Sequence, residues 1–127
     1  MLTALARLVL LCHSAAETRR FYEALGFVSV FEGRLGNGRP LLHLGLPAQE
    51  HVALWLIEAE GDAQAALVGA ETGDTPALVL YSDDLDADVD AVIAAGGSLV
   101  RRGDDPSARS AHVRDPLGTV MVLAQLA

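Results

Sequence analysis

The sequence predicts an α+β protein built from two tandem β-α-β-β-β modules. The main observation is an internal repeat, in which residues 8–30 align without gaps on residues 78–100. Each copy reads as a strand, a turn, a helix, a glycine and a second strand, and two more strand-like runs follow each copy. The identical pairs are Leu8 and Leu78, Val9 and Val79, Leu10 and Leu80, Ala24 and Ala94, Gly26 and Gly96, and Val30 and Val100.

The first module begins with an apolar strand at residues 8–12. Ser14 and Glu17 then have the spacing of a capping box, which predicts a helix start, and Gly26 suits the left-handed stop of that helix. The second strand follows the glycine. The module ends with two further strand-like runs, residues 40–46 and 51–58.

The second module has the same order of elements. Its first strand is followed by Asp83 and Asp84, either of which can cap the next helix, and Gly96 ends that helix. The segment Asp115-Pro116-Leu117-Gly118 has the composition of a tight hairpin turn. This turn joins the last two strand-like runs, residues 108–114 and 119–125.

A segment rich in alanine, glycine and acidic residues joins the modules. It covers residues 61–74 and has a pattern typical of a short helix at residues 62–68. The modules thus span about residues 1–60 and 75–127. Because about 60 residues make a marginal core, we expect residues 1–127 to form one domain, or modules to be exchanged between subunits.

Composition narrows the possible partners. The 127 residues include 9 Lys and Arg against 17 Asp and Glu, a net charge of −8, which argues against nucleic acid and favours a cationic small molecule. The single cysteine excludes an internal disulfide and multi-cysteine metal sites. Residues 1–12 fail as an export signal, and no apolar run is long enough to span a bilayer, so we expect a cytoplasmic protein.

Two segments resemble a known family when they are taken together with the repeat. Residues 17–27 (ETRRFYEALGF) and 114–118 (RDPLG) are similar to motifs of the vicinal oxygen chelate superfamily. That superfamily includes glyoxalase I, extradiol dioxygenases, and the fosfomycin and bleomycin resistance proteins. The resemblance covers nearly the whole chain and implies cupped mixed sheets and a homodimer.

The resemblance also implies positions for metal ligands, and these are occupied here by unsuitable side chains. The four positions fall on Arg7, on Trp55 or Ala53, on Ala77 and on Val122. A slip of one residue gives no better ligand, because it brings in only Leu8, Leu78 and Met121. A divalent metal needs several oxygen, nitrogen or sulfur donors, so we expect that the metal site is absent.

Five residues are the candidates for ligand binding. His43 and His112 lie in the third strand of each half and are either structural or the acid, base or metal ligand of a site. Trp55 is either a core residue or a stacking wall, and Arg7 is either a surface residue or a cation aimed at an anionic ligand. Val122 is a candidate from its position after the DPLG turn.

Two functions remain possible. The first is a metal-independent small-molecule binding protein, similar to the bleomycin resistance proteins, which sequesters an antibiotic or a metabolite and needs no cofactor. The scarcity of aromatic residues, 5% of the chain, counts against bleomycin itself. The alternative is a glyoxalase- or dioxygenase-like lyase or isomerase for a small oxygenated substrate. Such an enzyme needs a divalent metal (Zn, Ni, Mn or Fe) at non-standard ligands such as His43 and His112, or metal-free acid–base chemistry from them.

Overall fold

The computed structural model describes residues 1–49 and 51–126, and the chain divides into two compact units, Met1–Ala66 and Leu67–Ala127. Each unit contains one four-stranded mixed sheet, as the family resemblance implies. The division between the units falls inside the segment that was predicted to join the modules. No helix in the described residues is long and apolar enough to cross a membrane.

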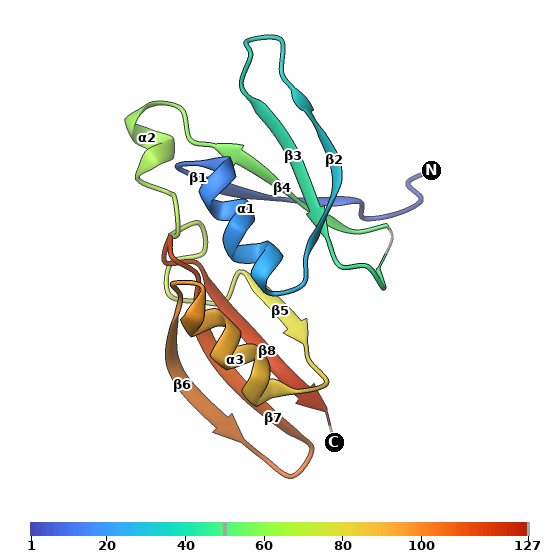
Figure 1. The fold of residues 1–127 in the computed structure, drawn as a ribbon, viewed down its shortest axis with the longest axis vertical. Coiled ribbons are helices and arrows are strands. Elements are labelled where there is room, and N and C mark those ends of the chain that lie inside the picture. The colour runs from blue at the N-terminus through green and yellow to red at the C-terminus, as the bar shows by residue number, and fades with distance from the viewer. Residues whose placement is uncertain (50, 127) are drawn as a thin grey trace. The chain divides into compact units, whose positions relative to one another are not determined.

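The first unit has the strand order β1-β4-β3-β2 (Figure 1). The pair β1 and β4 is parallel, whereas β4 with β3 and β3 with β2 are antiparallel. The elements of this unit are β1 (Arg7–Cys12), α1 (Ala15–Ala24), β2 (Val28–Arg34), β3 (Pro40–Gly45), β4 (Ala53–Glu58) and α2 (Gly61–Ala65).

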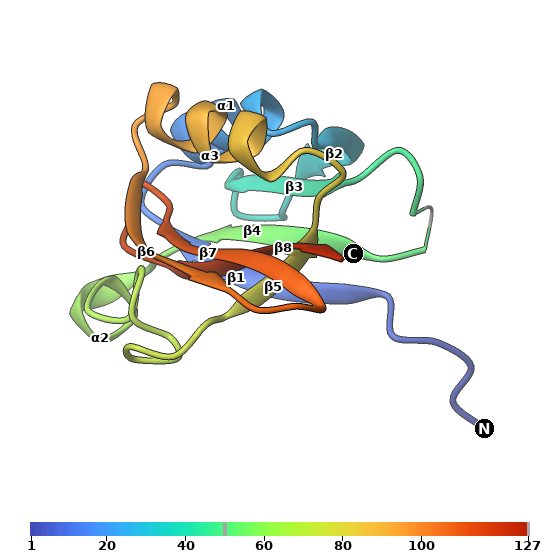
Figure 2. The same ribbon diagram turned by 90° about the horizontal axis from the view of Figure 1, so that it is seen from below.

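The second unit repeats this topology with the order β5-β8-β7-β6. The parallel pair is again formed by the first and last strands, here β5 and β8. Figure 2 shows α3 lying along one face of this sheet. The elements are β5 (Leu78–Tyr81), α3 (Leu85–Ala94), β6 (Ser98–Asp104), β7 (Ala108–Arg114) and β8 (Val120–Leu126).

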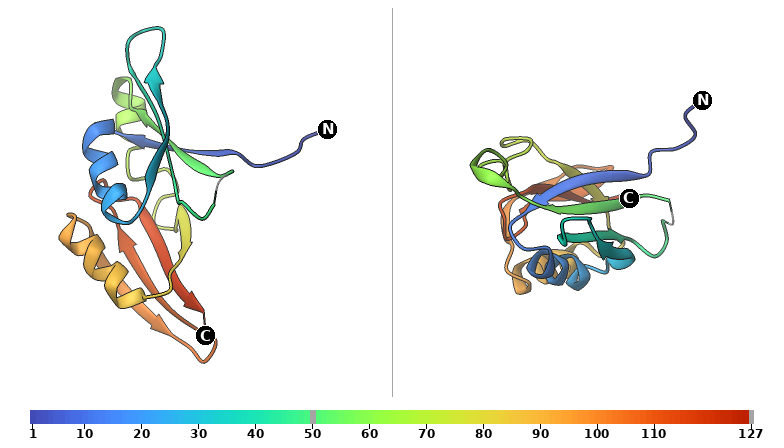
Figure 3. Two further views of the ribbon diagram at one scale, coloured as in Figure 1. Left: turned by 45° about the vertical axis from the view of Figure 1, so that its right-hand side comes forward. Right: turned by 90° about the horizontal axis from the view of Figure 1, so that it is seen from above.

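In each unit one ten-residue helix, α1 or α3, covers one face of the sheet. In the first unit α1 packs against β3 and β4 (Figure 3), and in the second α3 packs against β6, β7 and β8. Alternate strand residues point toward the helix and form the core of each unit. The fully buried side chains include Tyr22, Leu44 and Leu56 in the first unit and Leu85, Val89, Val92, Val113 and Met121 in the second.

The helix starts are set by side chains in equivalent positions of the two repeats. Ser14 accepts a hydrogen bond from the backbone N–H of Glu17, and Asp84 accepts one from the N–H of Ala87. The sequence therefore predicted the first cap, and of the two aspartates proposed for the second it is Asp84 that caps. Gly26 and Gly96 end the helices with φ of 101° and 102°, as expected for a left-handed stop.

A second helix-start contact was not predicted from the sequence. The Glu58 carboxylate at the end of β4 accepts from the N–H of Ala15 at 2.9 Å, and the Gln125 amide oxygen in β8 accepts from the N–H of Leu85 at 2.8 Å. The last strand of each unit therefore satisfies the first N–H of the helix that covers it.

The DPLG turn and the segment between the modules differ in how well the sequence predicted them. The turn forms as predicted, with the N–H of Gly118 bonded to the carbonyl of Asp115 at 3.0 Å. The short helix, by contrast, covers Gly61–Ala65 rather than residues 62–68. No side chain caps the start of this helix at Glu60. The helix is five residues long, and the residues that follow Ala65 form turns.

Candidate functional site

The face of the first sheet that lies opposite α1 is called here the open face. It carries Arg7 and Val9 from β1, Phe31 from β2, His43 from β3 and Trp55 from β4. Their neighbours in sequence, such as Leu10 and Leu56, are buried toward the helix, which assigns the five residues to the open face.

Strand register brings three rings together on the open face. His43 lies directly opposite Trp55 on β4 and directly opposite Phe31 on β2. The centroid of the His43 ring is 5.3 Å from that of Trp55 and 5.4 Å from that of Phe31. Val9 is opposite Trp55 on the other side of β4. The rings and Val9 thus form a continuous row across the four strands.

Arg7 reaches the same row from the edge strand. Its Nε donates to Nδ1 of His43 at 2.9 Å, and its Nη1 donates to the carbonyl of Ala6 at 2.8 Å. The residue opposite Arg7 on β4 is Ala53, whose small side chain leaves room for the arginine to cross that strand. The structure therefore brings together three of the residues that the sequence singled out, namely Arg7, His43 and Trp55.

The contact with Arg7 fixes the protonation of His43. Because Nδ1 accepts from the guanidinium, the ring proton of the neutral imidazole must be on Nε2. Burial, and then the positive charge of Arg7, lower the pKa of His43 below its ordinary value. Nε2 is buried and has no hydrogen-bond partner in the described part of the chain.

The lowered pKa predicts how His43 affects stability at acidic pH. The unfolded chain takes up the proton near the ordinary pKa of about 6.5, whereas the folded chain resists it. The neutral ring therefore contributes its full share of the free energy of unfolding above pH about 6.5. This contribution is lost as the pH falls from there through the lower pKa of His43 in the folded state. We expect urea unfolding at pH 7.5 and 5.0 to reveal a larger loss for the native protein than for His43→Gln. Equal losses would contradict the assignment.

The open face of the second sheet has an equivalent histidine in different surroundings. His112 lies opposite Val122 on β8 and opposite Arg101 on β6, and its Nε2 is 3.2 Å from Nη2 of Arg101. Nδ1 of His112 is buried without a partner among the described residues. Val122 stands in the place that Trp55 has in the first sheet, and Val79 lies beyond it on β5.

The residues that the family resemblance places at metal positions do not fit a metal. Arg7 carries a positive charge, and Ala77, Trp55, Ala53 and Val122 offer no suitable donor atom. Within the described residues no three or more His, Cys, Asp or Glu side chains group closely enough to hold an ion. Nδ1 of His43 is already occupied by Arg7, whose charge would also repel a cation.

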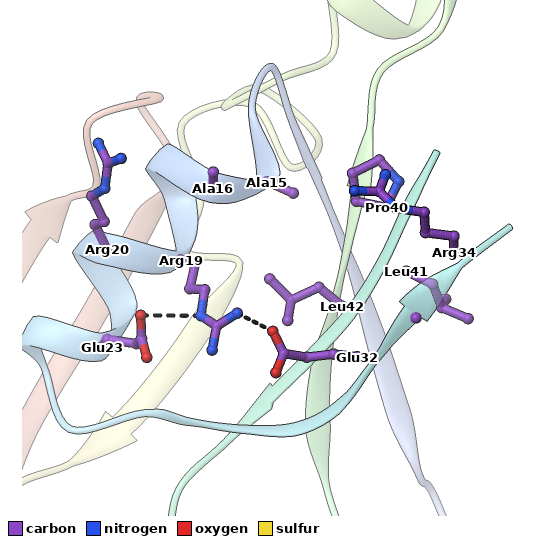
Figure 4. Close-up of a pocket in the computed structure, with 11 residues that line it drawn as sticks. Ala15, Ala16, Arg19, Arg20, Glu23, Glu32, Arg34, Pro40, Leu41 and Leu42 are labelled. Carbon is purple, nitrogen blue, oxygen red and sulfur yellow. Dashed lines mark hydrogen bonds and ion pairs between the residues drawn. The ribbon is translucent and has the colours of Figure 1, made fainter. Parts of the chain in front are cut away.

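A groove of about 720 Å³ lies on the other side of the first unit, between α1 and the β2–β3 hairpin (Figure 4). Arg19 on α1 pairs with Glu23 of the same helix at 3.1 Å and, across the groove, with Glu32 of β2. None of the residues predicted to bind a ligand lies in this groove. We therefore place the candidate site on the open face of the first sheet.

Comparisons with known proteins agree with this fold. The family model for the Glyoxalase/Bleomycin resistance protein/Dioxygenase superfamily matches residues 4–123. No curated protein matches the chain.

Solved structures match over nearly the full length of the chain. UcmS2 is 21% identical with a TM-score of 0.79, and the match covers 98% of each chain. TnmS3, an antibiotic binding protein from Streptomyces sp. CB03234, is 21% identical with a TM-score of 0.77, covering 99% of this chain and 98% of that one. A glyoxalase family protein from Bacillus cereus is 16% identical with a TM-score of 0.79, covering 99% and 95%. At such identities these likenesses establish the fold alone.

Proposed function

The chain belongs to the Glyoxalase/Bleomycin resistance protein/Dioxygenase superfamily, and we propose that it is a metal-independent small-molecule binding protein of that superfamily. Its role would be to sequester an antibiotic or a metabolite in the cytoplasm. Similarity to TnmS3, which is described as an antibiotic binding protein, supports this class of function. The fold by itself does not select it, because one fold supports many functions.

One observation carries the proposal: the open face of the first sheet leaves apolar side chains uncovered around a few convergent polar groups. Val9 is 55% and Phe31 49% exposed, while the Trp55 and His43 rings are half-buried between them. A small-molecule site typically combines apolar and aromatic walls with a few polar groups that fix orientation. Arg7 and His43 are those polar groups here.

Metal independence is supported by the same contacts. The guanidinium of Arg7 stands where the resemblance implies a ligand, and it occupies the Nδ1 lone pair of His43. The contact with Arg7 also disfavours a role for His43 as a general base, because the lone pair that would accept a proton is already used. The lyase or isomerase alternative therefore has less support than the binding protein.

We also propose a homodimer. In the described residues, β1 and β2 are the edges of the first sheet and β5 and β6 those of the second. Open edges favour pairing with another chain, and the exposed apolar residues Val28 and Val30 lie on one of them. Native mass spectrometry at micromolar concentration should give twice the chain mass of 13.3 kDa, and a monomer would contradict this part of the proposal.

The binding proposal can be tested with 2-naphthamide, a neutral aromatic probe. The chain has one tryptophan, so its indole N–H gives a single nuclear magnetic resonance signal that reports on the open face. Titration of chelator-treated protein should shift this signal in a saturable manner. Val9→Gln should weaken binding by about fivefold, since it replaces apolar contact surface beside Trp55.

A matched control is Ile93→Gln on α3. Ile93 is 51% exposed, close to the value for Val9, but it lies in the second unit. The control should bind 2-naphthamide like the native protein. No saturable shift in the native protein, or equal weakening by both substitutions, would overturn the proposed site.

A further inference from the structure

We propose that the open face of the first sheet selects aromatic molecules that carry an anionic group, and that Arg7 binds the anion. This inference rests on the proposed function and specifies its ligand class. It runs against the net charge of −8, which alone favours a cationic ligand. The local arrangement of charge around Arg7 is what supports the opposite preference.

Arg7 has no carboxylate partner within the described residues, although the chain has 17 acidic residues. Five other arginines do have such partners in the described residues, whereas Arg20, Arg34 and Arg101 do not: Arg19 pairs with Glu23 and Glu32, Arg39 with Glu60, Arg102 and Arg109 with Asp86, and Arg114 with Asp74. Arg7 is instead held by neutral acceptors, which are the imidazole of His43 and the carbonyls of Ala6 and His51. These contacts orient the guanidinium but leave its positive charge uncompensated.

The hydrogen-bonding groups of the Arg7 and His43 side chains that have no partner are all donors. Nε and Nη1 of Arg7 have partners, while Nη2 makes no hydrogen bond within the described part of the chain. The other unpaired group is the Nε2–H of His43, which is buried. A site that presents only donors, one of them cationic, is complementary to an acceptor such as a carboxylate or a phenolate.

The rings beside Arg7 supply the aromatic preference. Trp55 and Phe31 flank His43 in the row across the sheet, and Phe31 and Val9 are about half exposed. A planar ligand lying on this row would stack on the rings while its anion reaches Arg7 at one end. His43 acts here as a positioning residue, because it directs the guanidinium without neutralising it.

The second unit also contains an arginine–histidine contact, but its arginine lies on β6, in the place that Phe31 has in the first sheet. Arg101 contacts His112 and has no ion pair in the described residues, and the other ring nitrogen of His112 is again buried and unpaired. The row in that sheet has Val122 in place of the indole. The aromatic part of the proposal therefore applies to the first sheet alone.

The test compares 2-naphthoate with 2-naphthamide, which have nearly the same shape but differ in charge. We expect the native protein to bind 2-naphthoate more tightly by about tenfold to a hundredfold, as for a hydrogen bond to a charged group. Arg7→Gln should abolish this preference, because it lowers the affinity for 2-naphthoate far more than the affinity for 2-naphthamide. Binding is followed by the Trp55 indole signal at constant ionic strength.

The matched control is Arg20→Gln. Arg20 also lacks an ion pair in the described residues and lies in the same unit, but it is on α1, which covers the other face. This variant has the same net charge as Arg7→Gln and should keep the preference for 2-naphthoate. Arg7→Lys keeps a charge but not the planar fork, so it should retain a reduced preference.

The outcomes separate this inference from the proposed function. Equal affinities of the native protein for the two probes, or an unchanged preference in Arg7→Gln, would overturn the anion proposal while leaving the binding site in place. Binding of neither probe would instead count against the proposed function. If Arg7→Gln does not fold, the ratio in the native protein and the result for Arg7→Lys decide the question.

Discussion

Replacing Leu56 with alanine is expected to lower the free energy of unfolding by about 3 kcal/mol, a large part of the stability of a small domain. Leu56 is fully buried in β4, between Leu10 on β1 and Leu42 on β3 in the strand register, on the face covered by α1. Truncation removes apolar contacts and leaves a cavity that a sheet between two neighbours cannot close. Urea unfolding followed by circular dichroism measures the loss.

The control for this substitution is Leu5→Ala. Leu5 is 67% exposed in the segment before β1, so its truncation should change stability by less than about 0.5 kcal/mol. Similar losses for the two variants would show that the packing of the first unit is not as described. Leu56 is next to Trp55 in β4. Loss of its packing therefore also loosens the strand that carries the indole.

Replacing Gly97 with alanine is expected to destabilise the protein by a similar amount, about 3 kcal/mol, through overpacking. A Cβ at this position would lie 2.5 Å from the carbonyl oxygen of Arg114 and 2.6 Å from Cγ1 of Val92. The first contact is with backbone, so relief requires α3 or β7 to move. The equivalent residue in the first unit is Phe27, which the sequence repeat alone would suggest as an acceptable side chain.

Gly36→Ala serves as the control for Gly97→Ala. A Cβ at Gly36 meets nothing within 4 Å, and its φ is not in the left-handed region. We expect no loss, or a small gain of about 0.5 kcal/mol because the unfolded chain becomes less flexible. A harmless Gly97→Ala would contradict the close approach of Gly97 to the backbone of β7 and to Val92 on α3.

Together the two substitutions test the expectation that residues 1–127 form one domain, because Leu56 lies in the first unit and Gly97 in the second. In one cooperative domain, both variants shift the same single transition. In independently folding units, the native protein unfolds in two phases and each variant shifts only one of them.

Much of the fold could be predicted from the sequence because contacts between residues close in the chain determine where the helices of each repeat begin and end. Ser14 and Asp84 begin the helices and Gly26 and Gly96 end them through contacts within a few residues, so spacing alone indicates them. The bonds from Glu58 and Gln125 to the helix starts cross 40 residues or more. These two bonds could be predicted only from the order of the strands in each sheet, and the spacing of residues in the sequence does not reveal that order.

Three residues of the candidate site could be predicted from the sequence, but their arrangement in space could not. The sequence singled out Arg7, His43 and Trp55 separately, and the order β1-β4-β3-β2 is what places them side by side. Phe31 was missed because of an irregularity between Ser29 and Phe31, which shifts the register so that Phe31 rather than Val30 lies opposite His43. The same shift after Leu99 places Arg101 opposite His112.

We propose that the open face of the first sheet binds a small molecule without a metal. The most direct test of this proposal is elemental analysis of protein purified without chelator, followed by titration with 2-naphthamide in the presence of chelator and then with added Zn, Ni, Mn or Fe. We predict no stoichiometric metal and the same saturable shift of the Trp55 signal in every case. One equivalent of metal per chain, or binding that appears only when a metal is added, would show that the site depends on a metal.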